Sequence, residues 1–190
     1  MVKDLLKYFL ILAFGVLGSG AMAQEQAEGS APFGMPGPPP QMKEVAYLVG
    51  EWDVDMKMKM SDTATEFTPT KGTCRYESIL DGSALQMTYE GEMMGMMFKG
   101  FGLQCFNRET NKWQMTWSDN IGACISFYEG EKKDGVLSVS GIDRYQGMEF
   151  LTRISSFNET PTRFEWKMEM SMDGGKTFIT NATAVYTKKK

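Results

Sequence analysis

The sequence predicts an all-β fold, an antiparallel up-and-down β-barrel of about ten strands with a short helical cap at its N-terminal side. Apolar and polar residues alternate with a period of two from Gly50 onward, as in strands with one buried and one solvated face. Almost no segment has a helical pattern, so the strands must close on themselves or stack as a sandwich, and the hairpin spacing favours closure. Turn-forming residues recur at short intervals, at Asp81-Gly82, Gly95, Asp119-Asn120, Asp134-Gly135 and Asp173-Gly174-Gly175.

Residues 1–23 are expected to be a signal peptide. Lys3 and Lys7 give a basic start, an apolar stretch follows at 8–17, and Ala21-Met22-Ala23 is a small-x-small cleavage pattern. A membrane anchor is the alternative, but the stretch is much shorter than the ~20 residues that span a bilayer. We therefore expect an exported protein, periplasmic or secreted, with no membrane span after cleavage.

Residues 24–41 are expected to be a disordered linker rich in proline and glycine. Five of the seven prolines lie there, and the segment has little apolar surface to offset the cost of ordering. A proline-rich docking peptide is the alternative interpretation. The remaining residues, 42–190, are expected to form a single β-barrel domain of roughly 150 residues, long enough to bury a core without disulfides or a metal.

Within this domain, only Met42–Val49 is expected to be helical. The connection Ser61–Thr70, which contains Pro69, is the one long loop and a candidate lid over one mouth of the barrel. We expect strands near residues 50–60, 71–80, 84–91, 96–106, 112–118, 121–129, 135–141, 147–157, 162–172 and 178–187.

Composition excludes several function classes. The chain has no His, which removes Ser-His-Asp and Cys-His catalysis and every metal or haem site that needs imidazole. It carries 20 Lys and Arg against 24 Asp and Glu, a net charge of −4, with no basic run, so we expect no nucleic-acid partner. No Gly-rich phosphate loop or Cys-x-x-Cys motif is present, and we expect no cofactor and no bound metal.

Leu48-Val49-Gly50-Glu51-Trp52 resembles the G-x-W opening of lipocalins and related calycins, in which the Trp closes one end of the barrel. Nitrobindins are similar small barrels that hold haem through a His, and the absence of His counts against that function here. The sequence more closely resembles an uncharacterised bacterial family, domain of unknown function 1579. The residues that carry this resemblance are Leu48–Trp52, Tyr89–Met96, Gly100–Leu103, Thr116–Gly122 and Tyr186-Thr187. It implies a calycin-like, lipocalin-like barrel in an exported protein and provides no catalytic residues.

The 17 methionines suggest two interpretations. Thioethers are soft ligands that suit Cu(I), so a Met-rich copper(I) buffer is one alternative function. On a strand, however, residues i and i+2 share a face, so Met56, Met58 and Met60 continue the face of Trp52 and are expected to line the barrel interior. The same holds for Met168, Met170 and Met172 after Trp166. The cluster Met93–Met97 falls on a hairpin and is expected at a mouth, where an apolar patch marks ligand entry.

The three cysteines, Cys74, Cys105 and Cys124, are expected to be free, buried thiols. We place them on the second, fourth and sixth strands. Strands separated by one other strand lie about 9.5 Å apart, whereas a disulfide needs Cα atoms within about 4.4–6.8 Å.

Charged residues provide few candidates for chemistry. Glu90 and Glu92 alternate with Tyr89 and are expected on the outer face. Arg144 or Arg153 is a candidate to hold a carboxylate head group from inside, although alternation favours the surface for Arg153. We expect Asp119-Asn120 to form a hairpin turn.

The function that this pattern favours is an exported barrel that binds a small apolar or amphipathic ligand of unknown specificity. One alternative is a non-histidine enzyme that uses a carboxylate or Tyr in the cavity, but no nucleophile–base pair is visible in the sequence. Another is a filled barrel that acts through its surface on a protein partner. The residues expected to form the cavity wall and mouth are Trp52, Met56, Met58, Met94, Met97, Trp113, Met115, Trp117, Trp166 and Met168. Ligand identity and oligomeric state are left open by the sequence.

Overall fold

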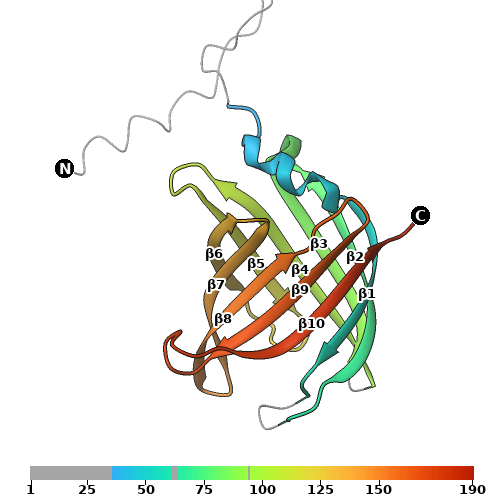
Figure 1. Cartoon of the computed structure of the whole chain (residues 1–190), viewed down its shortest axis with the longest axis vertical. Coiled ribbons are helices and arrows are strands. Elements are labelled where there is room, and N and C mark those ends of the chain that lie inside the picture. Colours follow the sequence, from blue (N-terminus) through green and yellow to red (C-terminus); the bar gives the residue numbers. More distant parts are fainter. Residues whose placement is uncertain (1–35, 61–63, 94) are drawn as a thin grey trace, which may run out of the picture. The chain divides into compact units, whose positions relative to one another are not determined.

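The computed structural model describes residues 36–60, 64–93 and 95–190. These residues form a closed barrel of ten antiparallel strands, in which each strand pairs with its neighbour in sequence and β1 pairs with β10 (Figure 1). The predicted fold class is thereby confirmed. The strands are β1 (Gly50–Met58), β2 (Thr68–Ile79), β3 (Ala84–Met93), β4 (Met96–Asn107), β5 (Lys112–Asp119), β6 (Ser126–Lys133), β7 (Val136–Tyr145), β8 (Met148–Phe157), β9 (Arg163–Ser171) and β10 (Ile179–Lys188).

The sixth strand differs most from the prediction. The alternation predicts a strand near residues 121–129, but β6 begins only at Ser126. The reason is a tight turn after β5, in which Asp119 Oδ1 accepts hydrogen bonds from the backbone N–H groups of Ile121 (2.9 Å) and Gly122 (2.7 Å). Residues held in this turn cannot continue the ladder with β5.

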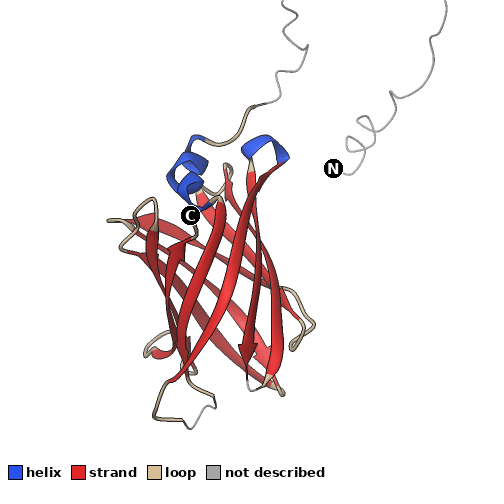
Figure 2. Cartoon of the chain, turned by 90° about the vertical axis from the view of Figure 1, so that its right-hand side faces the viewer, coloured by secondary structure: helices blue, strands red, loops and turns tan. Residues whose placement is uncertain are grey.

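Two short 3₁₀ helices complete the described part of the chain, η2 (Pro40–Leu48) and η3 (Leu80–Gly82), and both lie at one end of the barrel (Figure 2). η2 corresponds to the predicted helical cap. It begins within the segment expected to be linker, because the first helical positions need no N–H donor and accept proline readily. Residues 1–35, with the expected signal peptide and most of the expected linker, lie outside the described residues. No helix of the described part is long and apolar enough to cross a membrane.

An aromatic cluster closes the end of the barrel beneath η2. The fully buried Trp52 donates from Nε1 to the carbonyl of Leu48 at 2.7 Å, which ties β1 to η2. Its ring packs edge-on against Phe164, with centroids 5.0 Å apart, and Phe164 stacks on Tyr186 at 4.3 Å. Val45 of η2 is fully buried in the same cluster. The Trp of the G-x-W motif therefore closes this end of the barrel.

Two aromatic side chains lie flat against the inner wall because glycines leave room for them. A Cβ atom added at Gly100 would lie only 2.1 Å from Cζ2 of Trp117, and one added at Gly72 would lie 2.4 Å from the hydroxyl oxygen of Tyr89. Neither ring could keep its position over a larger residue. The glycines thus decide how far these rings project into the barrel.

All three cysteines are free, as predicted, but only Cys74 is fully buried. Burial raises the pKa of its thiol to about 12. Cys105 on β4 is partly buried. Cys124 lies in an exposed bend before β6 rather than on a strand, so the expectation of three buried thiols was wrong for it.

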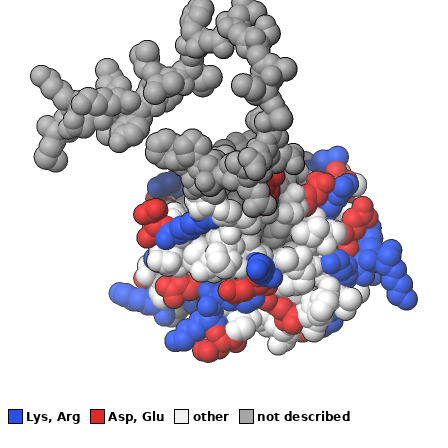
Figure 3. All heavy atoms as spheres, turned by 90° about the horizontal axis from the view of Figure 1, so that it is seen from above, with Lys and Arg blue, Asp and Glu red and all other residues white. Residues whose placement is uncertain are grey.

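The outer wall carries charges of both signs. Seen from the end that carries η2, lysine and arginine side chains are interspersed with aspartate and glutamate side chains (Figure 3). Glu90 pairs with Lys99 at 3.0 Å, and Glu92 is exposed, as alternation predicted. Arg153 pairs with Glu169 at 2.8 Å on the outer face of β8 and β9. None of these side chains, Glu90, Glu92, Arg153 and Glu169, lines the barrel interior.

The turn between β9 and β10 is built around Asp173 and predicts a pH dependence of stability. Thr177 donates to this carboxylate from its hydroxyl (2.5 Å) and its N–H (2.9 Å), and Ser171 donates from its hydroxyl (2.7 Å). These hydrogen bonds, those of Thr177 above all, lower the pKa of Asp173 from 3.8 to about 2. Because the folded pKa is the lower one, the stabilisation is complete above the unfolded pKa and is lost as the pH falls toward the folded pKa.

We therefore expect Asp173→Asn to reduce the stability lost on acidification. The measurement is urea unfolding at about pH 6 and about pH 2.5, with Asp134→Asn in the β6–β7 turn as the control. The free energy of unfolding of the wild type should fall further between the two pH values than that of Asp173→Asn. An equal fall in both proteins would contradict the prediction.

Candidate functional site

Beneath the aromatic cluster the barrel encloses a cavity of about 380 Å³. This volume falls within the range of small-molecule pockets, roughly 300–1,000 Å³. Inward-facing positions of many strands supply its wall, because residues i and i+2 of a strand point to the same face. The apolar wall includes Met56, Met58, Met87, Phe98, Trp113, Met115, Trp117, Leu137, Val139, Ile154, Trp166, Met168 and Met170.

Seven of the ten predicted site residues line this cavity: Met56, Met58, Trp113, Met115, Trp117, Trp166 and Met168. Trp52 does not, because it fills the closed end. Met97 does not either: its side chain is 55% exposed, and alternation along β4 points the next residue, Phe98, inward instead. Met94 lies outside the described residues. Of this hairpin, Met93 lines the cavity, whereas Met97 lies on the outer face of β4.

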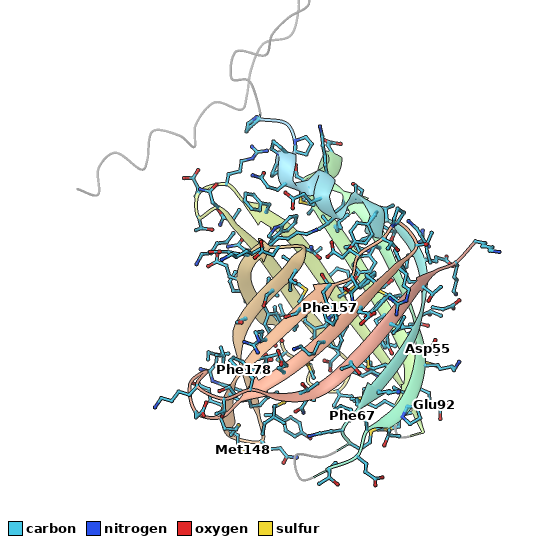
Figure 4. The ribbon with its side chains drawn as sticks, in the orientation of Figure 1. Asp55, Phe67, Glu92, Met148, Phe157 and Phe178 are labelled. Carbon is cyan, nitrogen blue, oxygen red and sulfur yellow. The ribbon has the colours of Figure 1, made fainter. Side chains whose placement is uncertain are left out.

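Solvent reaches the cavity at the end opposite η2. Cys124 and Tyr145 both line the cavity and are exposed, whereas Val45, which lines it under η2, is fully buried. Met148, at the start of β8, marks this lower end of the barrel (Figure 4). The mouth therefore lies beside the β5–β6 and β7–β8 connections.

A carboxylate on the inner wall of β7, Asp143, was missed by the sequence analysis. It accepts hydrogen bonds from the hydroxyls of Ser126 (2.5 Å), Tyr128 (2.8 Å) and Thr152 (2.6 Å). Burial, together with the negative charge of Asp143, raises the pKa of Tyr128, so this hydroxyl keeps its proton. The signal was present in the strand pattern, because Asp143 lies an even number of residues after the inward-facing Val139.

A second carboxylate, Asp119, ends β5 at the mouth. Its Oδ2 accepts from the indole Nε1 of Trp117 at 2.9 Å, while Oδ1 accepts from the turn that precedes β6. The neighbouring Asn120 accepts from the N–H of Lys99 (2.8 Å) and donates to the carbonyl of Met97 (3.0 Å) on β4. Asp119-Asn120 thus forms a turn, as predicted, and also holds Trp117 against the wall.

Two buried polar atoms lack a hydrogen-bond partner among the described residues, and both belong to side chains of the cavity wall: Nε2 of Gln104 and the hydroxyl of Tyr47. The Gln104 residue is only 8% exposed. Near Tyr47, Lys132 and Glu159 form a partly buried ion pair at 2.6 Å, and Ser156 also donates to Glu159 at 2.9 Å. Burial and the charge of Glu159 raise the pKa of Tyr47, so its hydroxyl remains a donor.

The arrangement offers binding groups more readily than catalytic ones. Each cavity carboxylate accepts three hydrogen bonds from the protein. Burial raises the pKa of Tyr76 and Tyr186, so neither is a ready base or nucleophile. In the part of the chain that the structure describes, no group of three or more Cys, Asp or Glu residues is arranged to hold a metal ion.

The sequence matches a family model described as "Protein of unknown function (DUF1579)" over residues 38–188, a range that contains all ten strands. The chain belongs to the DUF1579 family. The resemblance noted from its sequence motifs is confirmed. No curated protein matches the sequence significantly.

Two solved structures share the fold of this DUF1579 protein at low sequence identity. The S-type phycobiliprotein lyase CPES from Guillardia theta superposes with a TM-score of 0.52 at 11% identity, covering 78% of this chain and 92% of the lyase chain. Rv2717c from M. tuberculosis superposes with a TM-score of 0.58 at 12% identity, covering 80% and 99% of the two chains. At these identities the likeness establishes a common barrel fold.

Proposed function

We propose that this DUF1579 protein is an exported barrel that binds a small apolar or amphipathic molecule in its cavity. The observation that carries the proposal is the cavity of about 380 Å³, walled by methionine and aromatic side chains, closed by η2 at one end and reached by solvent at the other. A ligand that covers such a wall gains roughly 25 cal/mol for each Å² of apolar surface removed from water. Flexible methionine side chains let the wall adapt to the ligand shape.

Binding is favoured over catalysis because the two carboxylates of the cavity accept hydrogen bonds from neighbouring protein groups and are not arranged as a base beside a nucleophile. This chain shares its barrel fold with a phycobiliprotein lyase, and this likeness supports the proposal that the barrel binds a second molecule. We do not assign lyase activity to this chain, because at 11% identity the likeness shows only that the two proteins share a fold.

A substitution that fills the cavity tests the proposal. Val139→Phe replaces a small side chain on the inner face of β7 by a phenyl ring, whereas Ile142→Phe places the same ring on the outer face of that strand, where the native side chain is 47% exposed. We expect the fluorescent apolar probe N-phenylnaphthylamine to bind the wild type and Ile142→Phe equally. Binding to Val139→Phe should be weaker by about tenfold or more, a loss of about 1.4 kcal/mol or more.

Fluorescence titration measures these affinities, and circular dichroism checks that both variants fold. Equal affinity for all three proteins would place the probe outside the cavity and contradict the proposal. Failure of the wild type to bind the probe would also contradict it.

Export is tested by the N-terminus of the mature protein. We expect the protein isolated from its native host outside the cytoplasm to begin at Gln24, because cleavage follows Ala21-Met22-Ala23. Intact mass spectrometry reads this terminus directly. A chain that retains residues 1–23 in the membrane fraction would support the anchor instead.

A further inference from the structure

We infer that the cavity selects a ligand whose head group donates hydrogen bonds, an ammonium or amide N–H group, to Asp143. This inference rests on the proposed function and specifies the chemical class of its ligand. It disfavours carboxylate ligands such as fatty acids, which an apolar barrel would otherwise be expected to accept.

The hydrogen bonds around Asp143, a residue of the cavity wall, leave one acceptor site of its carboxylate unfilled. Ser126, Tyr128 and Thr152 each have one O–H group, and each donates it to this carboxylate. A carboxylate accepts about four hydrogen bonds, so one acceptor site remains on Oδ1, which takes only the bond from Ser126. A ligand therefore meets lone pairs at this site, and its matching group is a donor.

Charge favours the same class of ligand. Asp143 takes part in none of the salt bridges among the described residues. The adjacent Arg144 lies at the rim but is bound to Glu149 at 2.6 Å. A second carboxylate, Asp119, lies at the same mouth. An anionic head group would face two like charges here, whereas an ammonium group would be attracted to them.

The unpartnered Gln104 is an independent sign that a ligand contributes polar atoms. Its Nε2 is buried on the cavity wall without an acceptor, which is unfavourable for an amide group. Gln104 pairs across the sheet with Met115, and Met115 pairs with Tyr128. Gln104 is thus level with Tyr128, which donates to Asp143, and the β4 strand of Gln104 lies about 9.5 Å along the wall from the β6 strand of Tyr128. A ligand that extends along the wall from Asp143 and carries an acceptor there would satisfy Gln104 as well.

The test is competition for N-phenylnaphthylamine bound to the full chain. The competitors are octylamine, octanamide, octanol and octanoate, which have the same chain length and differ in the head group, each used below its micelle-forming concentration. We expect octylamine and octanamide to displace the probe at concentrations about tenfold lower than octanoate, as charge-assisted or donor–acceptor hydrogen bonds at one site imply. Octanol should displace the probe at concentrations between those of octylamine or octanamide and that of octanoate.

Substitutions test whether Asp143 causes the preference for head groups that donate hydrogen bonds. Asp143→Asn replaces a pure acceptor by a group that also donates, so it should abolish or invert the advantage of octylamine over octanoate. Asp55→Asn is the matched control, because Asp55 lies on the outer wall with its side chain 65% exposed (Figure 4) and its loss changes the net charge equally. Gln104→Leu should leave the advantage of octylamine over octanoate unchanged, because Gln104 lies on β4, three strands from Asp143 on β7.

The outcomes separate this inference from the proposed function. If octanoate displaces the probe as well as octylamine does from the wild type, the head-group preference is wrong while binding in the cavity stands. If Asp55→Asn changes the preference as much as Asp143→Asn, overall charge causes it and the inference is overturned. If Asp143→Asn does not fold, the order of the four competitors on the wild type decides alone. Failure of the wild type to bind the probe would instead overturn the proposed function.

Discussion

Trp52→Ala is expected to lower the free energy of unfolding by about 3–5 kcal/mol, the usual cost of truncating a fully buried tryptophan. The substitution removes the ring that packs on Phe164 and the 2.7 Å hydrogen bond that holds η2 through the carbonyl of Leu48. It also removes the face over which Lys188 Nζ lies, 5.3 Å from a ring centroid. The aromatic cluster that closes the barrel beneath η2 then lacks its central side chain.

Thermal and urea unfolding measure this loss. A domain of this size shifts its melting temperature by roughly 2–4 °C for each kcal/mol, so we expect a fall of roughly 6–20 °C. Trp52→Phe keeps most of the buried ring and should fall between the wild type and Trp52→Ala. Leu80→Ala, at a residue 72% exposed on η3, is the control and should change little. A loss below about 1 kcal/mol in Trp52→Ala would show that the cluster does not anchor η2.

Gly100→Ala is expected to have the second-largest effect, although it adds a single methyl group. That methyl would lie 2.1 Å from Trp117 Cζ2 and 2.2 Å from its Cη2, so the rigid indole must leave the wall. The move breaks the 2.9 Å hydrogen bond from Trp117 to Asp119 and turns the ring into the cavity. We expect a destabilisation of about 1–3 kcal/mol, typical of overpacking, together with weaker binding of N-phenylnaphthylamine.

Unfolding experiments measure the destabilisation, and tryptophan fluorescence reports the movement of the Trp117 ring. Gly37→Ala is the matched control, because a Cβ atom there meets no atom within 4 Å. In a Trp117→Ala background the added methyl meets no ring, so the cost of Gly100→Ala should become smaller. An equal cost in both backgrounds would mean that the clash lies with the strand backbone and not with the indole.

Much of the architecture could be predicted from the sequence because the burial pattern of a strand is local. The alternation of Trp52, Val54, Met56 and Met58 is enough to place all four side chains on one face, and β1 shows that arrangement. The same periodicity predicted the inward faces of β5 and β9. The scarcity of helical segments then left closure as the way to cover the apolar face, which the pairing of β1 with β10 accomplishes.

The sequence by itself therefore determined the fold class, the capped end and most of the apolar wall of this protein, since these depend on residue type and on a period of two. Only the tertiary structure decided the rest. Met97 lies outside because pairing fixes the phase of β4, and Asp143 meets Ser126 and Thr152 because the register of the three consecutive strands β6, β7 and β8 brings these side chains together. The unpartnered amide of Gln104 likewise depends on what the closed barrel places around it. Contacts between strands are set by register and closure, and neither is a property of any single segment.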